Sequence, residues 1–211
     1  MHIDLEKLTE RERYKLLMSS VLPRPIALVT TLDAQGRVNA APFSCFNIMG
    51  ASPATVVLGI DSHSPGLPKD TDSNIHSTGE FVVNLVAESM VHQTSLCASV
   101  LEAGCNELEH AGLTACDSIQ VRPPRVLQAP ISLECRRTMA LDIGNERSII
   151  IGNIVHYHIQ DQFYDAERGY VLADKIGLVA RMHGRTWYAR TTDLFEVDRS
   201  DVSRHALKDE S

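Results

Sequence analysis

The 211-residue chain lacks a long hydrophobic run and a leader-like N-terminus. Acidic and basic residues occur already between Met1 and Lys7, where a secretory signal peptide would be apolar. No uncharged apolar stretch approaches the roughly 20 residues that cross a bilayer as a helix. We therefore expect a cytoplasmic protein that does not insert into a membrane.

Cysteines are few and do not form a recognisable pattern. The chain has 5 of them, an odd number, and no two form a Cys-x-x-Cys pair. This pattern is typical neither of a disulfide framework nor of a zinc site. It favours reduced thiols in a cytoplasm.

Positive charge is also scarce. Lysine and arginine number 20 against 27 aspartates and glutamates, which gives a net charge of -7. So acidic a chain is not expected to bind nucleic acid or an anionic membrane broadly. Any anionic ligand must therefore be held by a local cluster of positive groups.

The familiar nucleotide and nucleophile motifs are missing as well. The sequence has no Gly-x-Gly-x-x-Gly Rossmann fingerprint and no P-loop. It also has no Ser-His-Asp or Cys-His motif of recognisable spacing. We therefore name no strict catalytic residue.

What is present is a series of short β-type segments separated by turns and short helices. We expect helices over residues 4–20, from residue 72 or 73, over 88–101 and over 107–110, and extended segments over 26–32, 37–41, 56–60, 81–86, 131–136, 148–159 and within 181–189. Strands of uneven length without regular βαβ alternation favour an antiparallel barrel over a doubly wound sheet. The expected fold class is therefore mainly β, with short decorating helices.

The chain divides into three expected segments. Residues 1–20 form an N-terminal helical arm, and residues 21–197 form one domain. Residues 198–211 form a polar C-terminal tail that we expect to be frayed.

The segment Lys69-Asp70-Thr71 comes directly before one of the expected helices, which Asp72 or Ser73 can cap and Gly79 ends. A cation, a hydroxyl and the free amides of a helix N-terminus together can hold a phosphate. Asp70 opposes that charge, so we expect it to turn away or to brace the loop. The simpler interpretation of this segment is a solvated helix cap.

The segment Ser44-Cys45-Phe46-Asn47 follows the first hairpin. Pro42 cannot donate to a strand ladder, so the chain leaves the sheet edge here, and Ser44 and Asn47 can present polar groups to a ligand. Phe46 can pack against a flat ring. The simpler interpretation is a strand end with a turn-forming asparagine.

Four motifs occur in this order: Leu22-Pro23-Arg24-Pro25-Ile26-Ala27-Leu28-Val29-Thr30-Thr31, Ala41-Pro42-Phe43-Ser44 with Phe46-Asn47, Lys69-Asp70-Thr71 with Asn74-Ile75, and Glu80-Phe81-Val82-Val83-Asn84. In order and spacing they resemble the flavin reductase-like family of FMN-binding split barrels. Further matches, among them Glu107 before Ala111-Gly112-Leu113 and Arg181-Met182-His183-Gly184, extend the resemblance over residues 12–190.

The resemblance implies a homodimer of antiparallel split β-barrels that binds FMN near the subunit interface, with residues 21–197 as the FMN-binding domain. By position, the implied cofactor-binding residues are Arg24, Ser44, Cys45, Phe46, Asn47, Lys69, Asp70, Thr71 and His183. Cys45 stands where an aromatic residue is more usual, which puts ring contacts at that position in doubt. Ala54 stands where a second proline is common, and this departure affects a turn.

The implied activity is that of an NAD(P)H:flavin reductase, in which NADH or NADPH is a transient reductant. A flavin-dependent monooxygenase is the implied acceptor of reduced flavin. One alternative is a non-enzymatic FMN-binding protein, a store or a sensor. A second is a metal-dependent barrel enzyme that uses His156 and His158, two residues apart on an expected strand, together with Glu134 or another acidic residue.

Overall fold

The computed structural model describes residues 1–99 and 105–197. The helical elements are η1 (Leu5–Lys7), α1 (Glu10–Ser20), α2 (Asp70–Thr78), η2 (Glu88–Met90), α3 (Val91–Leu96), α4 (Glu107–His110), η3 (Asp161–Phe163) and α5 (Ala173–Ile176). The strands are β1 (Arg24–Pro25), β2 (Ala27–Leu32), β3 (Val38–Phe43), β4 (Phe46–Ala51), β5 (Ala54–Asp61), β6 (Glu80–Leu85), β7 (Ala115–Cys116), β8 (Arg125–Val126), β9 (Ile131–Ile143), β10 (Arg147–Ile159), β11 (Tyr164–Asp165), β12 (Tyr170–Val171), β13 (Val179–Arg181) and β14 (Tyr188–Arg190).

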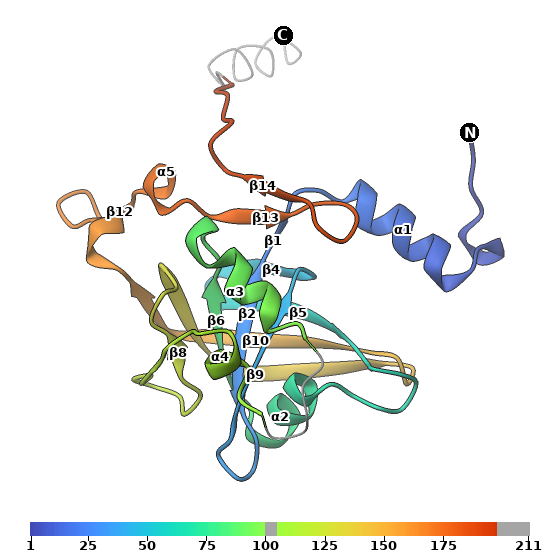
Figure 1. Cartoon of the computed structure of the whole chain (residues 1–211), viewed down its shortest axis with the longest axis horizontal. Coiled ribbons are helices and arrows are strands. Elements are labelled where there is room, and N and C mark those ends of the chain that lie inside the picture. The colour runs from blue at the N-terminus through green and yellow to red at the C-terminus, as the bar shows by residue number, and fades with distance from the viewer. Residues whose placement is uncertain (100–104, 198–211) are drawn as a thin grey trace, which may run out of the picture.

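One large antiparallel sheet dominates the molecule (Figure 1). It has 7 strands in the order β3-β2-β6-β9-β10-β5-β4. A smaller sheet of β1, β13 and β14 lies above it in this view, together with α1. The expected mainly β, antiparallel class with short helices is confirmed.

A connection of two residues joins the two edges of the large sheet. β3 lies at one edge and β4 at the other, yet only Ser44 and Cys45 separate them in the chain. The sheet must therefore curl until its edges meet at this corner. The N–H of Gly59 on β5 donates to the carbonyl of Cys45 at 2.7 Å and holds the corner in place.

The curled sheet encloses a core of apolar side chains. Val29 of β2, Leu58 of β5, Phe81 of β6 and Ile150 of β10 are all fully buried in it. A second core lies on the outer side of β2, where Leu28 packs with residues of η2, α3 and α4. β2 is buried on both faces for this reason, which explains its nearly continuous apolar run.

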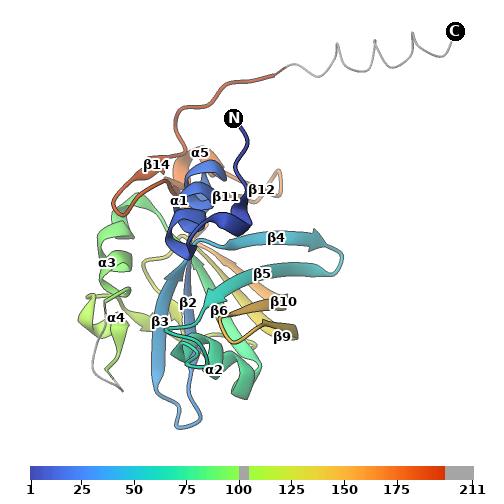
Figure 2. The same cartoon turned by 90° about the vertical axis from the view of Figure 1, so that its right-hand side faces the viewer.

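α2 closes the lower end of the barrel, between the β2–β3 hairpin and the β9–β10 hairpin (Figure 2). The helix begins at Asp70 with Lys69 as its N-cap, so the expected cap at Asp72 or Ser73 is wrong. Asp72 is instead buried and accepts a hydrogen bond from Ser148 of β10 at 3.1 Å. Gly79 ends the helix in the left-handed conformation, as expected.

β4 is an element that the sequence did not predict. The expected turn at Asn47 is absent, because the chain turns earlier and Phe46 already pairs with Leu58 of β5. β4 has exposed residues on most of its length and contains Asn47 and Gly50, which are weak strand formers. Backbone pairing with β5 therefore decides its conformation.

The N-terminal arm is helical as expected but broken into η1 and α1. Thr9 starts α1 with a capping box, in which its hydroxyl and the Glu12 carboxylate each bind the other's backbone. The boundaries of the three expected segments stay a prediction, and the tail 198–211 lies outside the described residues. Within residues 1–99 and 105–197 no helix is long and apolar enough to cross a membrane.

We predict that Gly152→Ala destabilises the barrel. A Cβ atom at Gly152 would lie 2.6 Å from Cζ and 2.9 Å from Cε1 of Phe81, whose ring is fully buried. Urea denaturation should show that the free energy of unfolding falls by about 1–3 kcal/mol. The matched control is Gly50→Ala on β4, where the nearest atom is 3.4 Å away. Equal stability of the two variants would contradict this account of the core.

Candidate functional site

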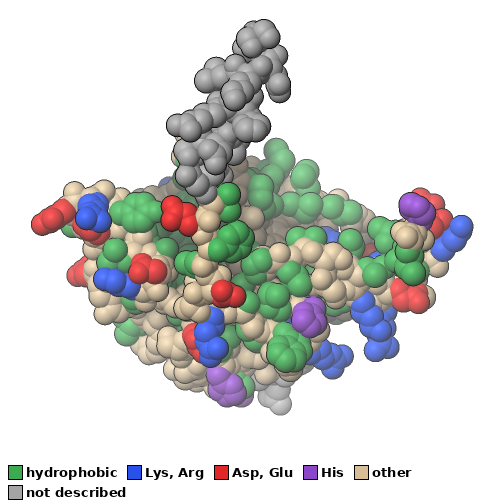
Figure 3. Space-filling model, turned by 90° about the horizontal axis from the view of Figure 1, so that it is seen from above, with side chains coloured by type: hydrophobic (Ala, Val, Ile, Leu, Met, Phe, Trp, Pro, Cys, Tyr) green, Lys and Arg blue, Asp and Glu red, His purple; other side chains and the backbone are tan. Residues whose placement is uncertain are grey.

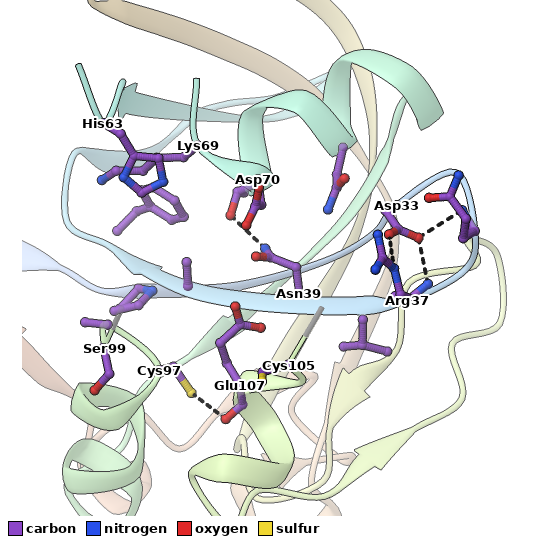
Figure 4. Close-up of a pocket in the computed structure, with 18 residues that line it drawn as sticks. Asp33, Arg37, Asn39, His63, Lys69, Asp70, Cys97, Ser99, Cys105 and Glu107 are labelled. Carbon is purple, nitrogen blue, oxygen red and sulfur yellow. Dashed lines mark hydrogen bonds and ion pairs between the residues drawn. The ribbon is translucent and has the colours of Figure 1, made fainter. Parts of the chain in front are cut away.

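A cavity of about 480 Å³ lies along β3. The start of α2 forms one wall, with Lys69 and Asp70, and the end of α3 and the start of α4 form the other, with Cys97, Ser99 and Glu107 (Figure 4). The volume lies within the range of about 300–1,000 Å³ that is usual for small-molecule sites. This cavity, the β3 cavity, is the candidate site.

Lys69 and the start of α2 give the β3 cavity its anion-binding groups. No side chain caps α2, and among the described residues the N–H groups of Asp70, Thr71 and Asp72 have no hydrogen-bond partner. Lys69 forms no ion pair with any described residue, and its Nζ lies 5.8 Å from the centre of the Phe43 ring. A free ammonium beside free helix amides is a phosphate-binding arrangement.

Thr71 faces the cavity from a fixed position. Its residue is 1% exposed, and its Oγ1 accepts a hydrogen bond from Nδ2 of Asn39 at 2.9 Å. Asn39 also donates to Thr31, which accepts a further bond from Asn74. The network fixes Thr71 as an acceptor toward Asn39, so its hydroxyl proton is left to donate to a ligand.

The opposite wall is acidic. Oε2 of Glu107 accepts the N–H of Ala40 on β3 at 3.0 Å. Burial raises the pKa of Glu107, and the nearby charge of Asp70 raises it further. Burial, with Glu107 nearby, also raises the pKa of Cys97 to about 11, so that thiol stays protonated and unreactive.

The segment Ser44-Cys45-Phe46-Asn47 lies at the corner where the sheet edges meet, beside the β3 cavity but outside its lining. Phe46 and Asn47 line a second, mostly apolar cavity of about 330 Å³. Asn47 also bonds the N–H of the next residue with its own Oδ1 at 2.8 Å. In the structure the residues Lys69, Asp70 and Thr71 therefore line the same cavity as Phe43. The corner segment lies beside this cavity, and its last two residues line the second one.

Arg24 has a structural position. It is 8% exposed, and its guanidinium donates to the carbonyls of Met18 at 2.6 Å, Val21 at 3.2 Å and Met182 at 3.2 Å. Its Nε donates to Oγ of Ser44 at 3.3 Å. Arg24 thus ties the end of α1 and the β13–β14 hairpin to the corner, and it lines neither cavity.

His183 is likewise absent from the lining of both cavities. It is exposed on the turn between β13 and β14, and its ring stacks on Trp187 with centroids 6.0 Å apart. In the single chain His183 lies in the β13–β14 turn, whereas Lys69 is the N-cap of α2.

The histidine pair of β10 lies beside the buried carboxylate of Glu134. His156 and His158 share a face, with ring centroids 4.6 Å apart, and Nε2 of His158 is hydrogen-bonded to Oε1 of Glu134 at 2.5 Å. Glu134 is fully buried and also accepts the N–H groups of residues 119, 120 and 121. Burial alone would raise its pKa, but these amides and His158 lower it. No three His, Cys, Asp or Glu residues of the described chain are arranged to hold a metal ion.

Sequence reasoning missed Asn39 as a residue of the site. The signal was an asparagine within an extended run, on the side of β3 that also carries Ala41 and Phe43. Glu107 was noted as a motif residue, but the sequence alone did not place it opposite Lys69.

Comparison with known proteins identifies the family. Residues 18–174 match the model of the flavin reductase like domain. A protein of Deinococcus radiodurans is 38% identical over 203 residues, which cover 94% of this chain and 89% of that protein.

Two solved structures are similar over nearly the whole chain. The 2-nitrobenzoate 2-nitroreductase NbaA of Pseudomonas fluorescens is 37% identical with a TM-score of 0.86, over 94% of this chain and 95% of that one. Nitrilotriacetate monooxygenase component B of Bacillus cereus is 33% identical with a TM-score of 0.88, over 93% and 98%.

We predict that Arg24→Ala destabilises the protein by about 2–4 kcal/mol, because it removes a buried side chain and leaves three partly buried carbonyl groups without their donors. Denaturant unfolding measures this loss. The control is Arg190→Ala, which removes an exposed ion pair with Glu88 and should cost at most about 1 kcal/mol. If both variants unfold at the same denaturant concentration, Arg24 does not hold the corner.

Proposed function

Because the chain belongs to the flavin reductase-like family, we propose that it is an FMN-binding oxidoreductase that transfers hydride from NADH or NADPH to flavin. The observation that carries the proposal is the combination of Lys69 with the unpartnered amides of α2 in one cavity. FMN has a dianionic phosphate, and a protein of net charge -7 needs such a local cluster to bind it.

In this proposal the start of α2 binds the phosphate. Lys69 supplies the charge, the N–H groups of residues 70 to 72 supply directed donors, and the buried hydroxyl of Thr71 adds another. Asp70 is exposed in the first turn of α2, where its carboxylate interacts favourably with the helix dipole. The residues present therefore fit a phosphate.

The flavin ring is proposed to lie toward the corner segment. Phe43 lines the cavity, and Ser44 and Cys45 follow it directly at the meeting of the sheet edges. Bound FMN supplies a hydride acceptor, so the chain needs no acid, base or nucleophile of its own. The roles left to the chain are to orient the ring and to exclude water.

We also propose the homodimer. Hydrophobic side chains gather across the middle of the face seen from above, while many of the charged ones lie toward its edges (Figure 3). The exposed apolar residues of α1 and β14, on the upper side of the molecule in Figure 1, include Leu17 and Tyr188. Such a patch favours a second copy as its partner. A monomeric mass in light scattering would contradict this.

The use of the reduced flavin has two candidates. Likeness to nitrilotriacetate monooxygenase component B favours delivery of reduced flavin to a flavin-dependent monooxygenase. Likeness to the 2-nitrobenzoate 2-nitroreductase NbaA favours direct reduction of a nitroaromatic compound. Consumption of 2-nitrobenzoate by the chain, FMN and reduced nicotinamide alone would select the second candidate.

Anaerobic stopped-flow mixing tests the activity. FMN-loaded protein should lose its flavin absorbance when mixed with NADH or NADPH. If neither nicotinamide bleaches the flavin while FMN is bound, the protein is a non-enzymatic FMN-binding protein. If FMN does not bind at all, both readings are wrong.

We predict that Lys69→Ala weakens FMN binding by about 10- to 100-fold, because it removes the ionic partner of the phosphate. Riboflavin, which has no phosphate, should bind the variant as it binds the wild type. Fluorescence titration measures both affinities. Lys175→Ala, on an exposed part of α5, is the control. An unchanged FMN affinity in Lys69→Ala would place the phosphate elsewhere.

A further inference from the structure

Glu107 has no role in the proposed chemistry, yet it is held firmly in the β3 cavity. It is the first residue of α4, and Oδ1 of Asn106 fixes the start of that helix by accepting the N–H of Leu108 at 3.0 Å. The N–H of Ala40 on β3 fixes Oε2 of the carboxylate at 3.0 Å. Figure 4 shows the side chain reaching from α4 toward β3, opposite Asp70 and Asn39.

The second oxygen of this carboxylate is available to a ligand. Among residues 1–99 and 105–197, Oε1 of Glu107 has no hydrogen-bond partner, and it is not one of the buried atoms that lack one. It is therefore reachable from the cavity that Glu107 lines. No cationic side chain of the described chain is paired with it.

The charges around Glu107 select against a second phosphate. Arg37 also lines the cavity, but it is paired with Asp33 at 2.6 Å. Lys69 is committed to the phosphate of FMN in the proposed function. An additional phosphate would thus meet Asp70 and Glu107 with no free cation from the described lining.

A carboxylate only accepts hydrogen bonds, so its partners in a nucleotide are hydroxyl and N–H groups. In FMN the hydroxyl groups are the donors nearest the phosphate, because the ribityl chain is joined directly to it. An acidic residue that binds the ribose 2′-hydroxyl is the usual means of accepting NAD, whereas an arginine accommodates the 2′-phosphate of NADP. We infer that Glu107 is the specificity-determining residue of the β3 cavity, and that its Oε1 accepts hydrogen bonds from the polyol of a bound nucleotide.

Two groups supply such a polyol: the ribityl chain of FMN and the ribose of the nicotinamide nucleotide. The titrations below distinguish them. The inference rests on the proposed function, because it takes the β3 cavity as the nucleotide site. In the ribose case NADH is preferred over NADPH, since a 2′-phosphate removes the donor and adds negative charge beside Glu107.

Calorimetric titration of Glu107→Ala tests the inference and distinguishes the two sources. FMN and riboflavin are titrated into flavin-free protein. NAD⁺ and NADP⁺ are titrated into FMN-loaded protein, where neither can transfer hydride. The control is Glu109→Ala. Glu109 is an exposed residue of the same short helix, and its carboxylate accepts a hydrogen bond from Asn106.

Two results support the inference. A rise of about tenfold in the dissociation constants of both FMN and riboflavin identifies the ribityl chain. A rise of about tenfold in the dissociation constant of NAD⁺, with no rise for NADP⁺, identifies the ribose. Affinities for all four ligands within twofold of those of Glu109→Ala overturn it.

If Glu107→Ala does not fold, Glu107→Gln replaces it, because the amide oxygen still accepts the N–H of Ala40. The dissociation constants of the same ligands are then expected to rise by about threefold, since the amide oxygen still accepts a hydrogen bond and only the negative charge is lost. These titrations need no hydride transfer. Failure of the wild type to bleach its flavin therefore refutes the reductase assignment separately and leaves the role of Glu107 to be decided by binding.

Discussion

The connection between β3 and β4 constrains everything else in this molecule. Only Ser44 and Cys45 connect strands that lie at opposite edges of a 7-stranded sheet. Two residues cannot span an open sheet of this width, so the sheet must close on itself. Gly59 permits the closure, because a Cβ there would lie 3.1 Å from Cβ of Cys45 while the backbones bond each other.

Charge is distributed sparingly around this cavity. The chain is acidic overall, and the described lining offers Lys69 as a cation that is not already paired. The helix amides of α2 add to that one charge without adding a second cation. Glu107 on the far wall keeps the rest of the cavity negative. The site is therefore suited to a ligand with a single terminal phosphate and an otherwise uncharged, hydroxyl-rich body.

Much of the fold could be predicted from the sequence, because the relevant signals are local. The alternation and β-branched content of residues 148–159 predicted β10, and the glycine at position 79 predicted the end of α2. β4 could not be predicted, since its strand character comes from pairing with β5, and Asn47, Gly50 and Ala51 within it disfavour strands. The start of α2 was also misplaced, because Asp72 resembles a cap but is buried against Ser148.

The site was predicted less completely than the fold. Lys69, Asp70 and Thr71 are contiguous, so one helix start brings them to the cavity. Arg24 was expected to contact the cofactor, whereas in the single chain it is buried and bonded to three carbonyls, which only the folded chain shows. Asn39 is bonded to Thr71 across 32 positions of sequence and Glu107 to Ala40 across 67, and no local pattern could reveal either contact.

The most direct test of the central claim is a crystal structure of the protein with FMN. We expect the phosphate within hydrogen-bond distance of Nζ of Lys69 and of the first amides of α2, and the flavin ring against the corner at Ser44 and Cys45. FMN bound with its phosphate away from α2, or in the apolar cavity beside Phe46, would contradict the account.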